Sequence, residues 1–234
     1  MIYPNKPDYS ELNINTINEK KYSHVKLLLG WVFYFAGYLL TENLIPIEKC
    51  HVIHCSLDDM IPFNEYFLIF YFFWYIFIAG SLAYFFFYDV QSFTKLQIFL
   101  IVTQVIAIAV YIIYPSVQIG RPETLDDTFL CNVAKWLYSV DTPTGVCPSL
   151  HVAYSIGIAS VWAKKKRVSL PFKILIFTLA LLISASVVFV KQHSVIDIIA
   201  AIPLGMIAEY IAYTRKYQAL NRLIKRKILK GEKR

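Results

Sequence analysis

The chain has 234 residues, of which 57% are hydrophobic and 17% charged, and its mean hydropathy is +0.51. This composition excludes an ordinary soluble domain and indicates an integral membrane protein. The net charge of +7 does not indicate nucleic-acid binding, because the basic residues collect beside apolar runs, where anionic lipid headgroups are the usual partner.

Six apolar runs are spaced along the chain. A bilayer core about 30 Å thick takes roughly 20 helical residues, so these runs predict an all-α, polytopic bundle of six transmembrane helices over residues 25–213. A cytoplasmic N-terminal tail (1–24) would precede the bundle and a basic cytoplasmic tail (214–234) would follow it. The start lacks the features of a secretory signal, which makes the first run a retained anchor. The runs lie near residues 25–40, 67–88, 96–114, 149–163, 170–190 and 195–213.

Charge placement predicts the orientation. Of the 23 lysines and arginines, only Lys49, Arg121, Lys135 and Lys191 lie in the first, third and fifth connections. Positive charge is retained on the cytoplasmic side of a membrane. We therefore expect a multi-pass protein of the cell membrane, with both termini in the cytoplasm and the odd-numbered connections on the extracytoplasmic face.

The cysteines all lie in those outer connections. Residues 50–55 read Cys-His-Val-Ile-His-Cys, which are zinc-binding residue types, but the spacing is too tight for all four to reach one tetrahedral ion. A short segment on the membrane surface is the favoured interpretation. An oxidising exterior permits disulfides such as Cys131 with Cys147 or Cys50 with Cys55, and three connectivities stay open.

The third connection carries an isolated cation. Pro115 ends the third run because proline removes a backbone donor, and Arg121 follows just outside the membrane. The forked guanidinium suits phosphate oxygens, although an arginine at a membrane edge is more often a structural anchor. Residues 125–140 are expected to form an interfacial helix.

The fourth run opens with Pro148, Ser149, Leu150 and His151. Proline suits the first turn of a helix, so the backbone N–H groups of residues 149–151 are expected to point outward. Helix N-termini bind anions. This places His151 beside a potential phosphate site.

The sixth run follows a tight turn that carries Lys191 and His193. His193 and Asp197 are four residues apart, so they are expected to share one helix face. A carboxylate near the bilayer centre costs roughly 2 to 3 kcal/mol. The histidine is the obvious partner that offsets this cost, and intramembrane carboxylates are functional by default.

Together these groups suit phosphoryl transfer through a phosphohistidine. His193 would attack phosphorus, Asp197 would orient its ring, and His151 would act as general acid and then base. Arg121 and Lys191, with the amides from Ser149, would hold the phosphate oxygens. The chemistry needs no metal and no other cofactor.

The motifs resemble those of the type 2 phosphatidic acid phosphatase superfamily, the lipid phosphate phosphatases. They are Arg-Pro at 121–122, Pro-Ser-Leu-His at 148–151 and Ser-x6-His-x3-Asp at 186–197. The resemblance covers residues 58–205. It implies a six-helix membrane enzyme with an outward-facing site, His193 as nucleophile, Asp197 as its partner, His151 as acid, and a lipid phosphate as substrate.

Two positions depart from the family pattern. The lysine expected seven positions before the arginine is Tyr114, and the arginine expected after Ser186 is Val187. Lys191 is expected to replace one of these cations. Leu150 inside Pro-Ser-Leu-His, together with a His-x3-Asp motif that lacks this arginine, resembles the branch that contains inositol phosphorylceramide synthase and sphingomyelin synthase. Those enzymes transfer a phospho-headgroup to an alcohol.

Hydrolysis of a lipid phosphate is the favoured activity, and transfer to an alcohol acceptor is the alternative. A catalytically inactive lipid-binding scaffold and a small transporter are weaker alternatives. The motifs of intramembrane serine proteases and of His-Glu-x-x-His metalloproteases do not occur. Phosphatidic acid, phosphatidylglycerophosphate, isoprenyl diphosphate and sphingolipid precursors all present a phosphate at a suitable depth.

Overall fold

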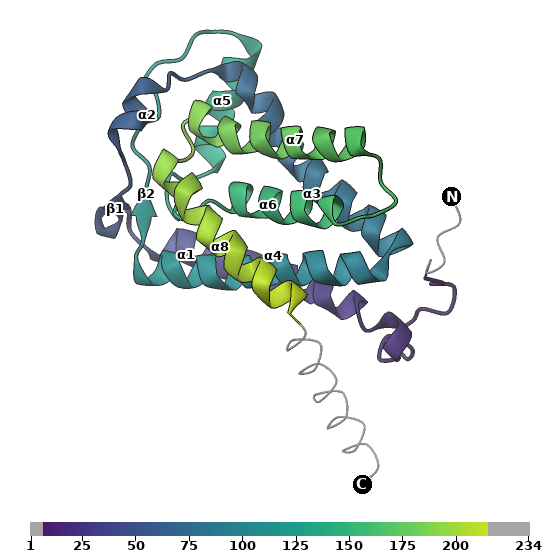
Figure 1. The fold of residues 1–234 in the computed structure, drawn as a ribbon. Coiled ribbons are helices and arrows are strands. Elements are labelled where there is room, and N and C mark those ends of the chain that lie inside the picture. Colours follow the sequence, from purple (N-terminus) through teal and green to yellow (C-terminus); the bar gives the residue numbers. More distant parts are fainter. Residues whose placement is uncertain (1–6, 215–234) are drawn as a thin grey trace.

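The computed structural model describes residues 7–214, which are mostly helical (Figure 1). Five helices are long and apolar enough to cross a membrane, as expected of an all-α membrane protein. They are Lys20–Leu44, Glu65–Tyr88, Val90–Ile113, Leu170–Phe189 and Val195–Tyr213. The remaining apolar run forms the shorter helix α6 (Leu150–Ala163). The predicted basic tail lies almost entirely outside the described residues.

The order of the elements follows the apolar runs, with small shifts in their ends. The helix predicted from residue 96 begins six residues earlier, and the helix predicted from residue 125 begins at 129. The long helices are α1 (Leu29–Leu44), α3 (Leu68–Tyr88), α4 (Val90–Ile113), α7 (Leu170–Phe189) and α8 (Val195–Tyr213), and the shorter ones are α2 (Ser56–Met60) and α5 (Phe129–Val140). Short 3-10 helices are η1 (Lys20–Tyr22), η2 (Val25–Leu28), η3 (Ile47–Lys49) and η4 (Glu65–Phe67).

Helix α6 is the centre of the bundle. It packs against α3, α4, α7 and α8, whereas α1 packs mainly against α4. Gly157 of α6 lies against the Phe99 ring of α4, so close that a Cβ atom there would come within 2.5 Å of a ring carbon. The glycine therefore lets two helices approach at the core of the bundle.

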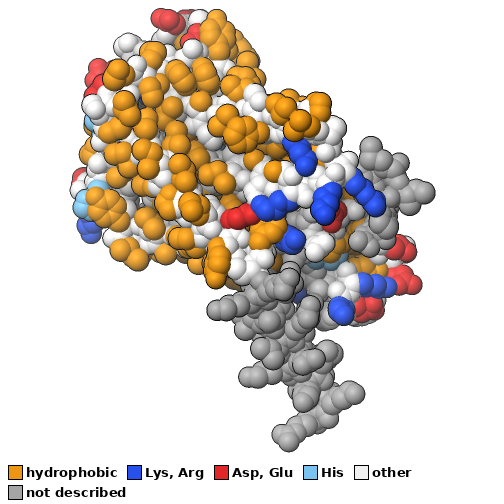
Figure 2. All heavy atoms as spheres, in the orientation of Figure 1, with side chains coloured by type: hydrophobic (Ala, Val, Ile, Leu, Met, Phe, Trp, Pro, Cys, Tyr) orange, Lys and Arg blue, Asp and Glu red, His pale blue; other side chains and the backbone are white. Residues whose placement is uncertain are grey.

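The two ends of the bundle differ in chemistry. Figure 2 shows a broad apolar face and a cluster of lysine and arginine side chains at one end. At this end, where α3 meets α4, Asp89 pairs with Lys165, and Glu209 pairs with Lys164. Part of the predicted N-terminal tail also packs here, since the Tyr9 ring stacks on a bundle phenylalanine at 4.8 Å.

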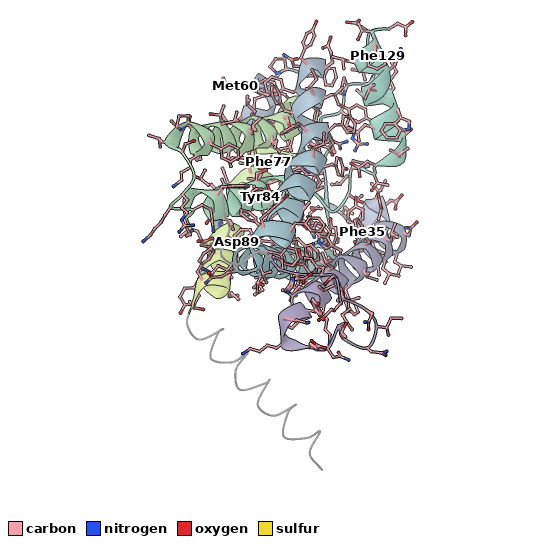
Figure 3. All side chains as sticks on the ribbon, turned by 90° about the vertical axis from the view of Figure 1, so that its right-hand side faces the viewer. Phe35, Met60, Phe77, Tyr84, Asp89 and Phe129 are labelled. Atoms are coloured by element: carbon pink, nitrogen blue, oxygen red, sulfur yellow. The ribbon has the colours of Figure 1, made fainter. Side chains whose placement is uncertain are left out.

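The opposite end carries the long connections. In Figure 3, Met60 and Phe129 lie at this end, whereas Tyr84 and Asp89 lie further along toward the other. Here β1 (His51–Val52) and β2 (Ser116–Val117) form a parallel pair, which the sequence analysis did not predict. This pair ties the first connection to the third, so segments far apart in sequence meet around one site.

The outer connections permit disulfides, but none forms in the described structure. Cys50, Cys55, Cys131 and Cys147 are all free. Cys50 and Cys55 lie on either side of strand β1. Cys131 is buried on the inner face of α5.

Candidate active site

The turn between α7 and α8 holds the first candidate pair. Ser194 caps α8, and the Asp197 carboxylate accepts the Ser194 backbone N–H at 2.9 Å. The same carboxylate oxygen lies 3.1 Å from His193 Nδ1. His193 is 8% exposed and Asp197 is fully buried. The pairing predicted from the four-residue spacing is therefore present, and it uses Nδ1 of His193, so Nε2 is the ring nitrogen that does not pair with Asp197.

The backbone of the turn is held in an unusual conformation. Lys191 has φ 54°, a left-handed geometry that costs a side-chain-bearing residue roughly 1 to 2 kcal/mol. Its ammonium donates to the carbonyl oxygens of Asp58 and Ile61. In this structure these two bonds hold the turn against α2 and the segment that follows, and the role of Lys191 as a phosphate ligand stays a prediction.

His151 lies beside His193. The two ring centroids are 5.6 Å apart with an interplanar angle of 68°. The His151 ring also contacts the rings of Tyr71 at 4.6 Å and Trp74 at 4.0 Å. The His151 ring is therefore held among aromatic rings beside His193.

The start of α6 differs from the prediction in one detail. Ser149 is the N-cap rather than a residue of the first turn, and its N–H donates to the backbone carbonyl of Asp197 at 3.2 Å. That amide is therefore not available to an anion. The bond instead joins the beginning of α6 to the beginning of α8, which places His151 and Asp197 at the same level of the bundle.

Arg121 is anchored around this turn. One terminal nitrogen, Nη2, donates to Gln192 Oε1 at 2.6 Å and to the Asp141 carbonyl at 2.9 Å, and the guanidinium lies 4.6 Å from the centre of the Tyr138 ring. Burial lowers the pKa of Arg121, and the nearby Asp141 carboxylate opposes that shift. The third connection thus brings a positive charge to the residue next to His193.

Five side chains of this region have a buried polar atom without a hydrogen-bond partner within residues 7–214. They are Arg121 Nε, Ser149 Oγ, His151 Nε2, Gln192 Nε2 and Asp197 Oδ1. Buried polar groups are normally paired, and an orphaned one indicates strain, a catalytic role, or a site for a bound water or ion. Four of these five atoms can donate a hydrogen bond, which is the requirement for holding an anion.

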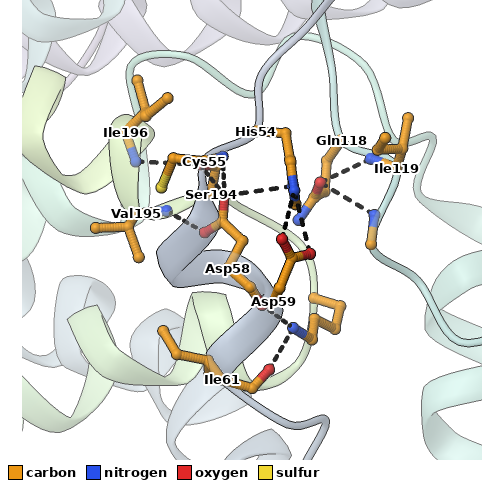
Figure 4. Close-up of polar contacts among 12 residues, drawn as sticks. His54, Cys55, Asp58, Asp59, Ile61, Gln118, Ile119, Ser194, Val195 and Ile196 are labelled. Carbon is orange, nitrogen blue, oxygen red and sulfur yellow. Dashed lines mark hydrogen bonds and ion pairs between the residues drawn. The ribbon is translucent and has the colours of Figure 1, made fainter.

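Asp58 of α2 is a site residue that the sequence analysis missed. Its carboxylate accepts the Ser194 hydroxyl at 2.6 Å, the Val195 N–H at 2.8 Å and the Cys55 N–H at 2.8 Å (Figure 4). Burial opposes ionisation of Asp58, but these hydrogen bonds outweigh it and hold the pKa below its ordinary value. The available signal was an acid three residues after Cys55, the spacing of a capping box.

Two further groups shape the electrostatics. Burial raises the pKa of Asp141, although a hydrogen bond from Tyr38 and the charge of Arg121 oppose the shift. Burial and the neighbouring Asp197 carboxylate raise the pKa of the Cys147 thiol to about 12. Cys147 is thus a neutral thiol at physiological pH, and the site adds no thiolate beside Asp197.

Neither of the two positions that depart from the family pattern carries a cation. Tyr114 stacks on His51 at 4.0 Å. Val187 is fully buried, and its carbonyl accepts the backbone N–H groups of Gln192 and His193. Within the described chain, no group of three or more His, Cys, Asp and Glu side chains is placed to hold a metal ion.

No protein-family model, curated protein sequence or solved structure matches the chain significantly. The resemblance to lipid phosphate phosphatases therefore depends on the three motifs alone. The structure brings residues of all three motifs to one end of the bundle. These residues are Arg121, His151, His193 and Asp197, and their contacts join them into one candidate site.

Proposed function

We propose that the protein is a membrane-embedded lipid phosphate phosphatase that works through a phosphohistidine intermediate. The observation that carries the proposal is the meeting of His193, Asp197 and His151 beside Arg121, with further unpartnered donor groups on Ser149 and Gln192. An imidazole oriented by a carboxylate can act as a nucleophile, and a second imidazole beside it can act as general acid and base.

In the first step His193 Nε2 attacks phosphorus while the bond from phosphorus to the lipid oxygen breaks. His151 gives a proton to that oxygen, and the lipid alcohol leaves. In the second step water attacks the phosphohistidine, His151 takes the proton from the water, and inorganic phosphate departs. Asp197 keeps Nδ1 of His193 protonated, so that Nε2 holds its lone pair, and stabilises the cationic intermediate.

The phosphate oxygens need donors throughout this cycle. Arg121 supplies the positive charge, and the unpartnered groups of Ser149 and Gln192 supply neutral hydrogen bonds. Preorganised donors of this kind stabilise the charge that develops on the phosphoryl oxygens. Lys191 would act indirectly, by holding the turn that carries His193.

The proposal places the site at the extracytoplasmic end of a six-span bundle. Helix α6 has 14 residues and is about 21 Å long, shorter than a bilayer core. With the buried segment before it, α6 would complete the sixth crossing and set His151 below the membrane rim. The basic end of the bundle would then face the cytoplasm of a cell-membrane protein.

The test is phosphate release by purified protein in detergent with EDTA present. Wild-type protein should release phosphate from phosphatidic acid or an isoprenyl diphosphate, and the His193→Ala variant should not. A phosphohistidine should be trapped in the wild type by acid-free quenching of labelled substrate. Full activity of His193→Ala would refute the role of His193 as nucleophile. Absence of activity in folded wild-type protein would favour the alternative of a catalytically inactive, lipid-binding scaffold.

Transfer of a phospho-headgroup to an alcohol is the second candidate, because the pocket holds one guanidinium and neither of the two other family cations. A phosphodiester carries a single negative charge and matches one cation better than a doubly charged monoester does. Labelled donor lipid supplied with inositol or ceramide distinguishes the candidates. Product formation without free phosphate would support transfer.

A further inference from the structure

A second group of unpartnered polar atoms lies deeper in the bundle than His151. Trp74 Nε1, Gln104 Nε2 and Tyr154 Oη are buried and have no hydrogen-bond partner in the described part of the chain. Tyr154 is fully buried and Gln104 is 2% exposed. An unsatisfied polar group in a membrane interior costs several kcal/mol. Three such groups together indicate that a polar ligand atom belongs there.

These three side chains, the deep polar cluster, are neighbours. The rings of Trp74 and Tyr154 stack with centroids 5.5 Å apart. Gln104, from α4, lies close enough to the Tyr154 hydroxyl for a weak hydrogen-bonding interaction, although the contact falls short of a full hydrogen bond. The Trp74 ring also lies 4.0 Å from the His151 ring, so the cluster adjoins the candidate active site directly.

The depth of the deep polar cluster matches the part of a bound lipid that lies just below its phosphate. His151 and Tyr154 are three residues apart on α6, which places them on the same face and about 4.5 Å apart along the helix axis. Indole and amide N–H groups donate hydrogen bonds, and a tyrosine hydroxyl can donate as well. The cluster therefore suits an acceptor oxygen that lies a few bonds below a phosphate.

The adjacent residue of α4 shows that this feature is specific to the cluster. Thr103 is also fully buried, but its hydroxyl donates to the Leu100 carbonyl of its own helix at 2.8 Å. It therefore needs no ligand. Gln104 has no such local partner for its amide nitrogen.

We infer that the deep polar cluster binds the ester or amide carbonyl of the lipid whose phosphate lies at His193. This inference rests on the proposed function and narrows its substrate class. Glycerolipid and sphingolipid phosphates carry a carbonyl near the phosphate, whereas isoprenyl phosphates are pure hydrocarbon beyond the phosphate ester. The site therefore selects lipids with a polar backbone over isoprenyl phosphates.

The test compares kcat/KM for phosphatidic acid and farnesyl monophosphate in the variants Tyr154→Phe and Gln104→Leu. Each variant should lose about 3- to 10-fold on phosphatidic acid, the effect of one neutral hydrogen bond. Neither should change on farnesyl monophosphate. Thr103→Val is the matched control, and it should leave both substrates unaffected.

Several outcomes would overturn the inference while leaving the proposed function in place. One is an equal loss of kcat/KM on both lipids in the variants, and another is no loss on either lipid. A third is a wild-type kcat/KM that is higher for farnesyl monophosphate than for phosphatidic acid and that requires His193. If the wild-type protein hydrolyses neither lipid, the proposed function is refuted, and lipid binding then tests the inference. In His193→Ala protein, phosphatidic acid should then raise the Tm more than farnesyl monophosphate does, and adding Tyr154→Phe should remove the difference. Equal Tm shifts would refute the inference.

Discussion

Replacing Asp58 with asparagine should slow catalysis without weakening lipid binding. The carboxylate accepts three hydrogen bonds, two of them from Ser194 and Val195 in the turn beside His193. Asparagine keeps one acceptor oxygen and turns an NH2 group toward a backbone N–H. Hydrogen bonds to a charged group contribute about 1.5 to 3 kcal/mol each, and a buried donor left unpaired adds to the loss.

We therefore expect a loss of roughly 2 to 4 kcal/mol in the energy that holds the turn in place. If that whole amount is needed to place His193, kcat falls roughly 30- to 1,000-fold, since each 1.36 kcal/mol is tenfold in rate. KM for phosphatidic acid should change little, because Asp58 has no direct contact with the candidate phosphate site. Steady-state kinetics on purified protein give both constants.

The matched control is Asp59→Asn. Asp59 is the next residue of α2, but its side chain is 69% exposed and pairs only with His54. It should retain kcat within about twofold, as exposed ion pairs contribute little. Asp58→Asn protein that keeps wild-type kcat, or loses Tm while the folded fraction keeps its kcat, would refute the positioning role. Partial recovery of kcat in Asp58→Glu would support it.

Further expectations concern acid stability, thiol reactivity and packing. Because its hydrogen bonds hold the pKa of Asp58 below the ordinary 3.8, its stabilisation is present above about pH 4 and is lost as the pH falls through the depressed pKa. The acid decline of Tm should therefore be shallower in Asp58→Asn, and an unchanged decline would contradict this. The Cys147 thiol, with a pKa of about 12, should react with maleimide much more slowly at pH 7.5 in native than in unfolded protein, and equal rates would exclude a protonated thiol. Gly157→Ala should destabilise by about 1 to 3 kcal/mol through overpacking, seen as a lower Tm that Phe99→Leu restores; a neutral Gly157→Ala would show that the two helices can separate at no cost.

Local periodicity explains what could be predicted from sequence. The apolar runs specify the helices because a membrane span needs a minimum length of hydrocarbon-compatible chain. The contact between His193, in the turn before α8, and Asp197, in the first turn of α8, follows from their four-residue spacing. Both inferences depend only on residues within one continuous stretch of about 20 residues.

Contacts between distant segments could not be predicted in this way. Asp58 and Ser194 are 136 positions apart, and the acid reaches the turn only because α2 folds across the same end of the bundle. Lys191 was predicted to bind phosphate from its charge and position. Its φ of 54° and its two carbonyl partners instead fix the side chain toward α2, and nothing in the local pattern carries that information.

The charge balance of the pocket bears on which reaction it performs. Arg121 is the guanidinium near the turn, and the side chain at 187 is buried in the bundle where an arginine would not reach water. His193 is neutral before it attacks, so it does not cancel the charge of the Asp197 carboxylate beside it. A doubly charged monoester would meet that carboxylate, one guanidinium and neutral donors in a low-dielectric site, where unbalanced charge is costly. A singly charged phosphate, either a diester or a protonated monoester, leaves less charge unbalanced, so substrate charge should distinguish transfer from hydrolysis more clearly than chain length does.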